Sequence, residues 1–462
     1  MFYNLHTIWQ LILTAFGLLF FAGVSWRRPR LGAWLVIFLA PLYLLKIGNW
    51  PMTILEALIW VFVGVWVVRR IKTGNKSLPT SLFEREERRS GFFWPVVLIL
   101  SGVIISTIFS SDPKIGLGIL KSWFLAPIIF AFVLDDVFEG SGFKEIFSAL
   151  FASAAAVAAI SFVYLIFGRL TFDGRLAAFY LSPNHLAMWL SPGIVAGMGL
   201  WFCAKNNWQK FFLFLVSCFL FLVLYFTYSY GAWIGLVVAV IFILFYLWRL
   251  KLINQRHLFH VSCFMFFVFA LVFFLQLYGS YGEKLMSLLS SPRSSWQSRL
   301  MVWQAAIKIL KNHWLIGIGP GLFQPYYLDY QKYFPPYLEW AVPQPHNLFL
   351  AWWLQAGLLG LIGFLWLVIK FFKQTASIVR HHLFPTLSST EERGQNELTT
   401  PTVSPSRVRE GESKKGWVFA IKQPLTIFSM AVIIYFLVHG LVDATFWKND
   451  LALIFWVIVL SS

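Results

Sequence analysis

The sequence predicts an all-α fold, a polytopic bundle of transmembrane helices. Hydrophobic residues make up 59% of its 462 residues and charged residues only 12%, whereas soluble domains average roughly 25% charged residues. Apolar runs close to the length that crosses a bilayer recur along nearly the whole chain. The strict alternation typical of strands does not occur, and a helix is the simplest way to satisfy backbone polar groups inside lipid.

Each predicted span is a largely uninterrupted apolar run, and together the spans number about 12 or 13. The last run is short. The runs lie at residues 9–26, 31–47, 54–68, 93–109, 119–134, 146–168, 186–204, 211–227, 232–248, 258–278, 347–372, 424–440 and 451–462.

The basic residues predict how the spans are oriented. A net charge of +17 would indicate nucleic acid binding in a soluble protein, but here Lys and Arg fall mostly in short connections. If the spans alternate, segments 69–89 and 370–422 share one side, which the positive-inside rule makes cytoplasmic. Segments 169–185, 279–345 and 441–450 then lie on the outer side. We therefore expect a lipid bilayer, and no nucleic acid, as a partner.

Changes in composition divide the chain into four parts. The outer segment 279–345 is long for a loop without structure of its own, and the apolar spacing within 296–311 predicts an amphipathic helix at the outer surface. Its predicted apolar face consists of Trp296, Leu300, Trp303, Ala306, Ile307 and Leu310. The four parts are N-terminal transmembrane helices at 1–168, a central core at 169–372 that includes the large, partly helical outer loop, a partly disordered cytoplasmic loop at 373–423, and C-terminal transmembrane helices at 424–462.

The outer side carries several cationic side chains and few carboxylates. Arg175, Arg293 and Arg299 all fall there, and the acidic residues on that side form no paired motif. Because divalent cations bind clustered oxygen ligands, we expect no metal site and no cofactor. Guanidinium groups bind phosphate oxygens bidentately, so the pattern favours an anionic ligand such as a lipid diphosphate.

His346 stands between Pro345 and Asn347, immediately before the apolar run 347–372. An imidazole can accept a proton near neutral pH, and the proline keeps the preceding backbone out of a helix. Asn347 is a preferred residue for capping the helix that follows. From these residues alone, His346 is either a general base or a hydrogen-bonded histidine at the membrane interface.

Two further loops predict local structure. We expect Asn184 and His185 to cap the span that begins near residue 186. The glycines of GIGPG, residues 317–321, do not fit a nucleotide-binding motif. They predict a tight turn.

Several segments between residues 160 and 460 carry a resemblance to a known family through their order and spacing. They read GRLAAFYLSPNHLA, YSYGAWIGL, SRLMVWQAAIKILKNHWLIGIGPGLF, PHNLFLAWWLQAGLLGLIGF and HGLVDATFWKNDLALIFW. This ordered set resembles the O-antigen ligase and O-antigen polymerase family of bacterial membrane proteins.

The resemblance implies a metal-independent glycosyltransferase of cell envelope biogenesis, which inverts the configuration at the anomeric carbon. Members of the family transfer a glycan from an undecaprenyl diphosphate carrier to a hydroxyl acceptor, which is lipid A core, a growing polysaccharide or a protein. It also implies a multi-pass protein of the bacterial cytoplasmic (inner) membrane, with its active site on the periplasmic or extracellular side.

The resemblance assigns roles to individual residues. The essential histidine of the family's His-Asn motif corresponds to His346, which would deprotonate or orient the acceptor hydroxyl, and Arg299 would neutralise the diphosphate. Many relatives have Ser-Arg-Gly where this chain has a tyrosine, Tyr230, which donates a hydrogen bond but carries no positive charge. Either Arg175 or another cation replaces that arginine, or the donor site differs. We expect the substrate site to include Arg175, Tyr230, Trp303, Asn347 and Arg293.

The sequence leaves alternatives open. It does not choose between a ligase, a polymerase and an enzyme that glycosylates exported proteins. A membrane transporter or flippase of a small solute or lipid-linked glycan is a different class, which sites near the bilayer midplane and internal repeats would favour. Here the polar residues gather at the outer surface, so we favour glycan transfer.

Overall fold

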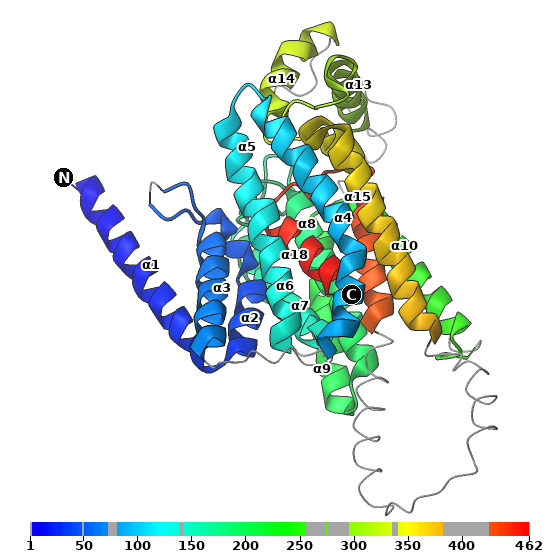
Figure 1. The fold of residues 1–462 in the computed structure, drawn as a ribbon. Coiled ribbons are helices and arrows are strands. Elements are labelled where there is room, and N and C mark those ends of the chain that lie inside the picture. Colours follow the sequence, from blue (N-terminus) through cyan, green and yellow to red (C-terminus); the bar gives the residue numbers. More distant parts are fainter. Residues whose placement is uncertain are drawn as a thin grey trace, which may run out of the picture.

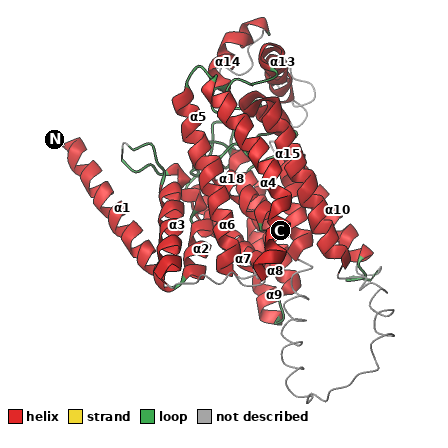
Figure 2. Cartoon of the chain, in the orientation of Figure 1, coloured by secondary structure: helices red, strands yellow, loops and turns green. Residues whose placement is uncertain are grey.

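The computed structural model describes residues 2–48, 50–72, 81–138, 142–254, 274, 295–334, 341–381 and 425–461. Within these residues the chain is a bundle of helices (Figure 2). Lys46 and Thr53 form an isolated antiparallel β-bridge. The predicted all-α class is therefore confirmed.

Most helices run along a common direction, and α13 and α14 gather at one end of the bundle (Figure 1). The α-helices are α1 (Phe2–Arg27), α2 (Pro29–Phe38), α3 (Ile54–Lys72), α4 (Ser81–Ile108), α5 (Pro113–Ile119), α6 (Ala126–Phe138), α7 (Gly142–Ile166), α8 (Pro183–Cys203), α9 (Asn207–Tyr225), α10 (Tyr230–Arg249), α13 (Ser295–His313), α14 (Phe323–Tyr330), α15 (Leu348–His381) and α18 (Asn449–Leu460), with one further helix at Leu425–His439.

Eight helices of the described residues are long and apolar enough to cross a membrane. They begin with α1 and end with α15, and one of them joins α5 to α6 through a π-helical turn, η2 (Leu120–Leu125). Every predicted apolar run that falls on described residues contains helix. The predicted run 258–278 lies outside the described residues, apart from Phe274.

Helix α18 is a buried element in the middle of the bundle (Figure 1). All of its 12 residues are buried, and a helix that is apolar on every side belongs in a core. At 1.5 Å per residue its length is about 18 Å, which is less than the roughly 30 Å hydrocarbon core. It packs against α6, so the run predicted at 451–462 forms a central helix too short to cross the bilayer alone.

Helices α4 and α15 are held together by small residues. A Cβ atom on Gly102 of α4 would lie 2.4 Å from the backbone nitrogen of Gly360, and one on Gly363 would lie 2.8 Å from the nitrogen of Ile99. Such close approach of backbones is typical of helix pairs in membranes. The two helices therefore form one rigid wall of the bundle.

Helix α15 is broken at Gly357, where φ is 68° and ψ is −174°. The GIGPG turn docks into this break, since Ile318 N donates to Leu354 O (2.7 Å) and Leu358 N donates to Leu315 O (3.0 Å). Gly317, Gly319 and Gly321 have φ values of 81°, 96° and 80°, a region that glycine adopts at little cost. The predicted tight turn is confirmed, and it fixes α13 and α14 above α15.

The predicted helix forms as α13. From its predicted apolar face, Ala306 and Leu310 are buried in a separate small core with α14 and α15, whereas Trp296 and Ile307 are about half exposed. Val302, Ala305 and Ile309, which lie outside the predicted face, are buried in the same core.

Basic residues end several helices away from α13 and α14. Arg27 ends α1, Arg249 ends α10, and Arg69, Arg70 and Lys72 lie in the last turn of α3. The C-terminal ends of α1 and α10 lie at the end of the bundle opposite to α13 and α14 (Figure 1). The structure thus separates the basic helix ends from the large predicted outer loop.

The α4–α15 contact yields a stability prediction. Gly102→Ala places a methyl group against the α15 backbone and is expected to lower the free energy of unfolding by about 1–3 kcal/mol. The measurement is the thermal unfolding midpoint of the purified protein in detergent. Gly64→Ala in α3, where a Cβ meets no atom within 4 Å, is the control, and equal midpoints for the two variants would contradict the close packing.

Candidate active site

The segment that joins the helix Leu425–His439 to α18 is the centre of the candidate site. Its backbone oxygens receive hydrogen bonds from distant parts of the chain. Leu348 N donates to Gly440 O (2.6 Å), Asn347 Nδ2 donates to Leu441 O (2.9 Å), and Arg299 Nε donates to Val442 O (2.9 Å). This segment therefore brings the start of α15 and the first turns of α13 to one place.

His346 and Asp443 form a histidine–carboxylate pair in this segment. His346 Nδ1 lies 3.4 Å from Asp443 Oδ1, and the His346 side chain is 25% exposed. An Nδ1–H donated to the carboxylate corresponds to the tautomer whose Nε2 carries the lone pair. The pair is therefore arranged to hold an imidazole in the form that accepts a proton.

The backbone around His346 is fixed on both sides. His346 has a φ of 47°, a left-handed conformation that is uncommon for residues other than glycine. Its carbonyl accepts a hydrogen bond from Trp303 Nε1 (3.3 Å). Asn347 Oδ1 accepts from Phe349 N and Leu350 N at 3.0 Å each, which confirms the predicted cap of α15.

Asn184 connects Asp443 to Arg175, a partly buried arginine. Its Nδ2 donates to Asp443 Oδ2 (2.9 Å), and its Oδ1 accepts from Arg175 Nη2 (2.7 Å). Arg175 also donates through Nε to Thr227 O (2.8 Å), just before α10 begins. Loop 169–182 and the first turn of α8 are thereby tied to the carboxylate beside His346.

Electrostatics place Arg175, Arg299 and Tyr230 in the same cluster. Burial lowers the pKa of Arg175; Asp173 opposes this shift, Arg299 adds to it by like-charge repulsion, and Asp443 and Tyr230 oppose it. The hydrogen bonds show the same arrangement, because Arg175 reaches Asp443 through Asn184 and Arg299 binds the neighbouring Val442 O. The site thus holds two guanidinium groups near one buried carboxylate, an arrangement suited to an anion that interacts with both cations.

Asp443 remains ionised in this environment. Burial alone would raise its pKa, but the hydrogen bond with His346 and the electrostatic attraction of the basic side chains around it, Arg299 among them, hold the pKa of this carboxyl well below its ordinary value. Asp443 Oδ1 also accepts from Ala444 N (2.8 Å). The carboxylate therefore faces His346 as a hydrogen-bond acceptor held in place by the backbone.

Six of the seven expected site residues thus meet around one short segment. The seventh, Arg293, lies outside the described residues. The sequence predicted no role in the site for Asn184 or Asp443. One signal for Asp443 was present, because it is a lone carboxylate between two apolar runs in HGLVDATFW.

His185 does not have the predicted capping role. Ser182 caps α8, since its hydroxyl accepts from His185 N (3.2 Å). The His185 ring is buried, with Nε2 3.2 Å from both carboxylate oxygens of Asp450. Asn184 therefore binds Asp443 and His185 binds Asp450, at the two ends of the segment 443–450. These contacts fix the segment against the start of α8.

Part of this cluster lies in a region that matches a known protein family. Residues 211–365 match the family model described as O-antigen ligase, and this range contains Tyr230, Arg299, Trp303, His346 and Asn347. This central region is therefore similar to the O-antigen ligase family. No curated protein matches the sequence.

The O-antigen ligase match sets the general activity. It supports glycan transfer of the O-antigen ligase or polymerase type, in a membrane and with a lipid-linked glycan donor. The matched range ends before Asp443 and begins after Arg175 and Asn184. In the structure, hydrogen bonds connect these three residues to His346 of the matched range.

The buried carboxylate yields a pH prediction. Because the folded-state pKa of Asp443 is depressed, its ionisation stabilises the protein above the unfolded pKa of about 3.9. That stabilisation is lost as pH falls below this value towards the folded pKa. Asp443→Asn is therefore expected to be less stable than the wild type at pH 7, with the difference narrowing below about pH 4.

The measurement is the unfolding midpoint in detergent at several values between pH 7 and pH 3. Asp329→Asn serves as the control, because Asp329 is exposed on α14 and is expected to leave the midpoint nearly unchanged at each pH. A constant difference between Asp443→Asn and the wild type over the whole range would contradict the depressed pKa.

Proposed function

We propose that the protein transfers a glycan from an undecaprenyl diphosphate carrier to a hydroxyl acceptor, with the cluster around Asp443 as its active site. The observation that carries this proposal is the His346–Asp443 pair, set beside Arg299 and Arg175 in a chain whose central region is similar to the O-antigen ligase family. A base next to two guanidinium groups matches a reaction in which a hydroxyl loses a proton and a diphosphate leaves.

In this mechanism His346 acts as the general base. Its Nε2 takes the proton of the acceptor hydroxyl while the acceptor oxygen forms a bond to the anomeric carbon of the donor sugar. Asp443 keeps the imidazole in the required tautomer and stabilises the imidazolium that forms. A general base of this kind contributes a factor of about 10²–10⁴ to the rate.

The leaving group is the undecaprenyl diphosphate. As the bond from the anomeric carbon to the diphosphate oxygen breaks, negative charge builds on that oxygen, and Arg299 and Arg175 stabilise it. Because the acceptor attacks the face opposite to the diphosphate, the configuration at the anomeric carbon inverts. The guanidinium groups supply the charge that a divalent cation supplies in other transferases, so we propose that the reaction is metal-independent.

Arg175 is the proposed substitute for the arginine that many relatives have at the position of Tyr230. It reaches the start of α10 from loop 169–182 through its bond to Thr227 O, and its charge interacts with Tyr230. We propose that Trp303 and Asn347 shape the site through their bonds to His346 O and Leu441 O. Arg293 stays a candidate for binding the donor.

We propose that the site faces the periplasm or the exterior of a bacterial inner membrane. The separation of the basic ends of α1, α3 and α10 from α13 and α14 supports this orientation through the positive-inside rule. The acceptor is lipid A core, a growing polysaccharide or a protein. We further propose that the central core 169–372 acts together with the C-terminal helices of 424–462, which supply Asp443.

The first test measures transfer of radiolabelled glycan in proteoliposomes that contain EDTA, with undecaprenyl diphosphate oligosaccharide and cell-extracted acceptors. His346→Ala and Arg299→Ala are each expected to lower kcat at least about 100-fold. Arg299→Lys is expected to recover only part of the loss, since lysine lacks the planar fork.

His313→Ala and Lys311→Ala, at the end of the same helix α13, are the matched controls and are expected to retain activity. Full activity of both His346→Ala and Arg299→Ala would contradict the assignment of the site. Transfer by the wild type that occurs without EDTA but not in its presence would contradict metal independence.

A second test asks whether Arg175 supplies the missing charge. Arg175→Ala is expected to lower the transfer rate about 100-fold or more, and Tyr230→Arg in the same chain is expected to restore much of it, because the new guanidinium returns positive charge to the same place. Arg169→Ala, an exposed arginine in the same loop, is the control. If Arg175 were only structural, Tyr230→Arg would not restore transfer.

A further inference from the structure

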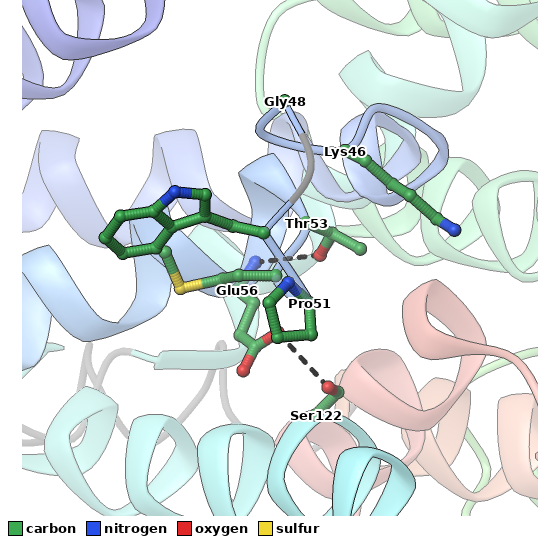
Figure 3. Close-up of a pocket in the computed structure, with 8 residues that line it drawn as sticks. Lys46, Gly48, Pro51, Thr53, Glu56 and Ser122 are labelled. Atoms are coloured by element: carbon green, nitrogen blue, oxygen red, sulfur yellow. Dashed lines mark hydrogen bonds between the residues drawn. The ribbon is translucent and has the colours of Figure 1, made fainter. Parts of the chain in front are cut away.

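A cavity lies apart from the cluster around His346 and Asp443. It has a volume of about 480 Å³ and is lined by residues of the loop 46–53, by Glu56 at the start of α3 and by Ser122 of η2 (Figure 3). Ligand pockets in proteins commonly measure about 300–1,000 Å³, so the cavity is large enough for a sugar unit.

Glu56 forms the floor of this cavity and is only 1% exposed. Its carboxylate receives Lys121 Nζ at 2.8 Å and the Ser122 hydroxyl at 3.2 Å. Figure 3 shows Glu56 and Ser122 pointing toward one another. Burying an ionised carboxylate is costly unless it is paired and hydrogen-bonded, and Lys121 and Ser122 supply these partners here.

The partners of Glu56 lie on a π-helical turn. Residues Leu120–Leu125 interrupt the span that α5 and α6 form, and π-helical turns occur frequently at functional sites. The turn places Ser122 at the cavity, and the neighbouring Lys121 binds two lining residues, since its Nζ lies 2.8 Å from Glu56 Oε1 and donates to Pro51 O (3.0 Å). The π-helical turn therefore supplies one lining residue and both side-chain partners of Glu56.

The cavity is connected to the candidate active site by the C-terminal segment. Asn449 Nδ2 lies 3.5 Å from Thr53 Oγ1 on the cavity wall, and Asp443 lies six residues earlier in the chain. Six residues span at most about 20 Å, so the wall of the cavity is within the reach of an oligosaccharide whose reacting end is at His346.

The lining favours a neutral, hydroxyl-rich ligand. A sugar hydroxyl can accept a hydrogen bond from the Lys46 ammonium group and exchange one with the Thr53 hydroxyl. The Glu56 carboxylate beneath them is buried and already paired, and its negative charge disfavours a phosphate group. Trp50 is 64% exposed and offers an aromatic face on which the C–H face of a pyranose ring can stack.

We infer that this cavity is a glycan subsite, which binds a pyranose unit of the donor or acceptor glycan at a distance from the reacting sugar. The inference rests on the proposed function, since it assigns to the cavity part of the same substrate. The lining residues make no bond to the reacting atoms, so they affect glycan binding rather than the chemical step.

Steady-state transfer kinetics test the inference. Trp50→Ala and Lys46→Gln are expected to raise KM for one glycan substrate about tenfold, equivalent to about 1.4 kcal/mol, with kcat nearly unchanged. A rise in the KM of the donor assigns the subsite to the donor glycan, and a rise in that of the acceptor assigns it to the acceptor. A substrate shortened to a single sugar is expected to show no difference between variants and wild type.

Trp94→Ala is the matched control, because Trp94 on α4 is exposed to the same extent (63%) but lies away from the cavity lining. Unchanged KM values in Trp50→Ala, or an equal rise in Trp94→Ala, would overturn the subsite.

A binding measurement separates this inference from the proposed function. The probe is the free glycan released from the lipid-linked donor and acceptor by mild acid, and its binding to His346→Ala protein is followed by saturation-transfer NMR. The subsite is supported if the glycan binds the His346→Ala protein but not the double variant His346→Ala/Trp50→Ala. This result does not depend on whether the wild type transfers glycan.

No binding of the glycan released from either substrate would overturn the subsite. The subsite would also be overturned if anionic phosphatidylglycerol, and not the glycan, raised the thermal stability of the wild type but not of Lys46→Gln. That result would assign the cavity to a lipid headgroup.

Discussion

The site depends on one constraint, the hydrogen bonding of the largely buried segment between the helix Leu425–His439 and α18. Polar backbone groups inside a membrane protein need a partner, because lipid offers none. Here the partners come from parts of the chain that are far apart in sequence. Arg299, Asn347 and Leu348 bind its carbonyl groups, and Asn184 binds its carboxylate.

Aromatic packing keeps this segment in place. Phe446 and Trp447 are buried, and their ring centroids lie 4.7 Å and 5.3 Å from that of Trp352 on α15. Phe124 of η2 contacts both rings from the other side. These rings bury large apolar areas without needing a fixed polar partner for most of their surface, so they hold the polar groups of the segment in register with α8, α13 and α15.

The sequence was sufficient to predict the elements that the membrane itself determines. An apolar run of fixed minimum length is required at each crossing, and so the helices could be located; the Asn347 cap and the glycine turn follow from equally local rules. The pairing of Asp443 with His346 and Asn184 joins residues 97 and 259 positions apart, and no local rule contains such information. For the same reason, the buried role of His185 was not foreseen.

The position of the carboxylate near the end of the chain has a consequence for biogenesis. A chain is synthesised from its N-terminus, so His346, Arg299 and Arg175 enter the membrane before Asp443 and Asp450 exist. Until the last two helices insert, the imidazole lacks its carboxylate and the start of α8 lacks both of its acidic partners. The proposed site is therefore complete only when these helices have inserted, and a chain that stalls earlier lacks the carboxylate that binds His346.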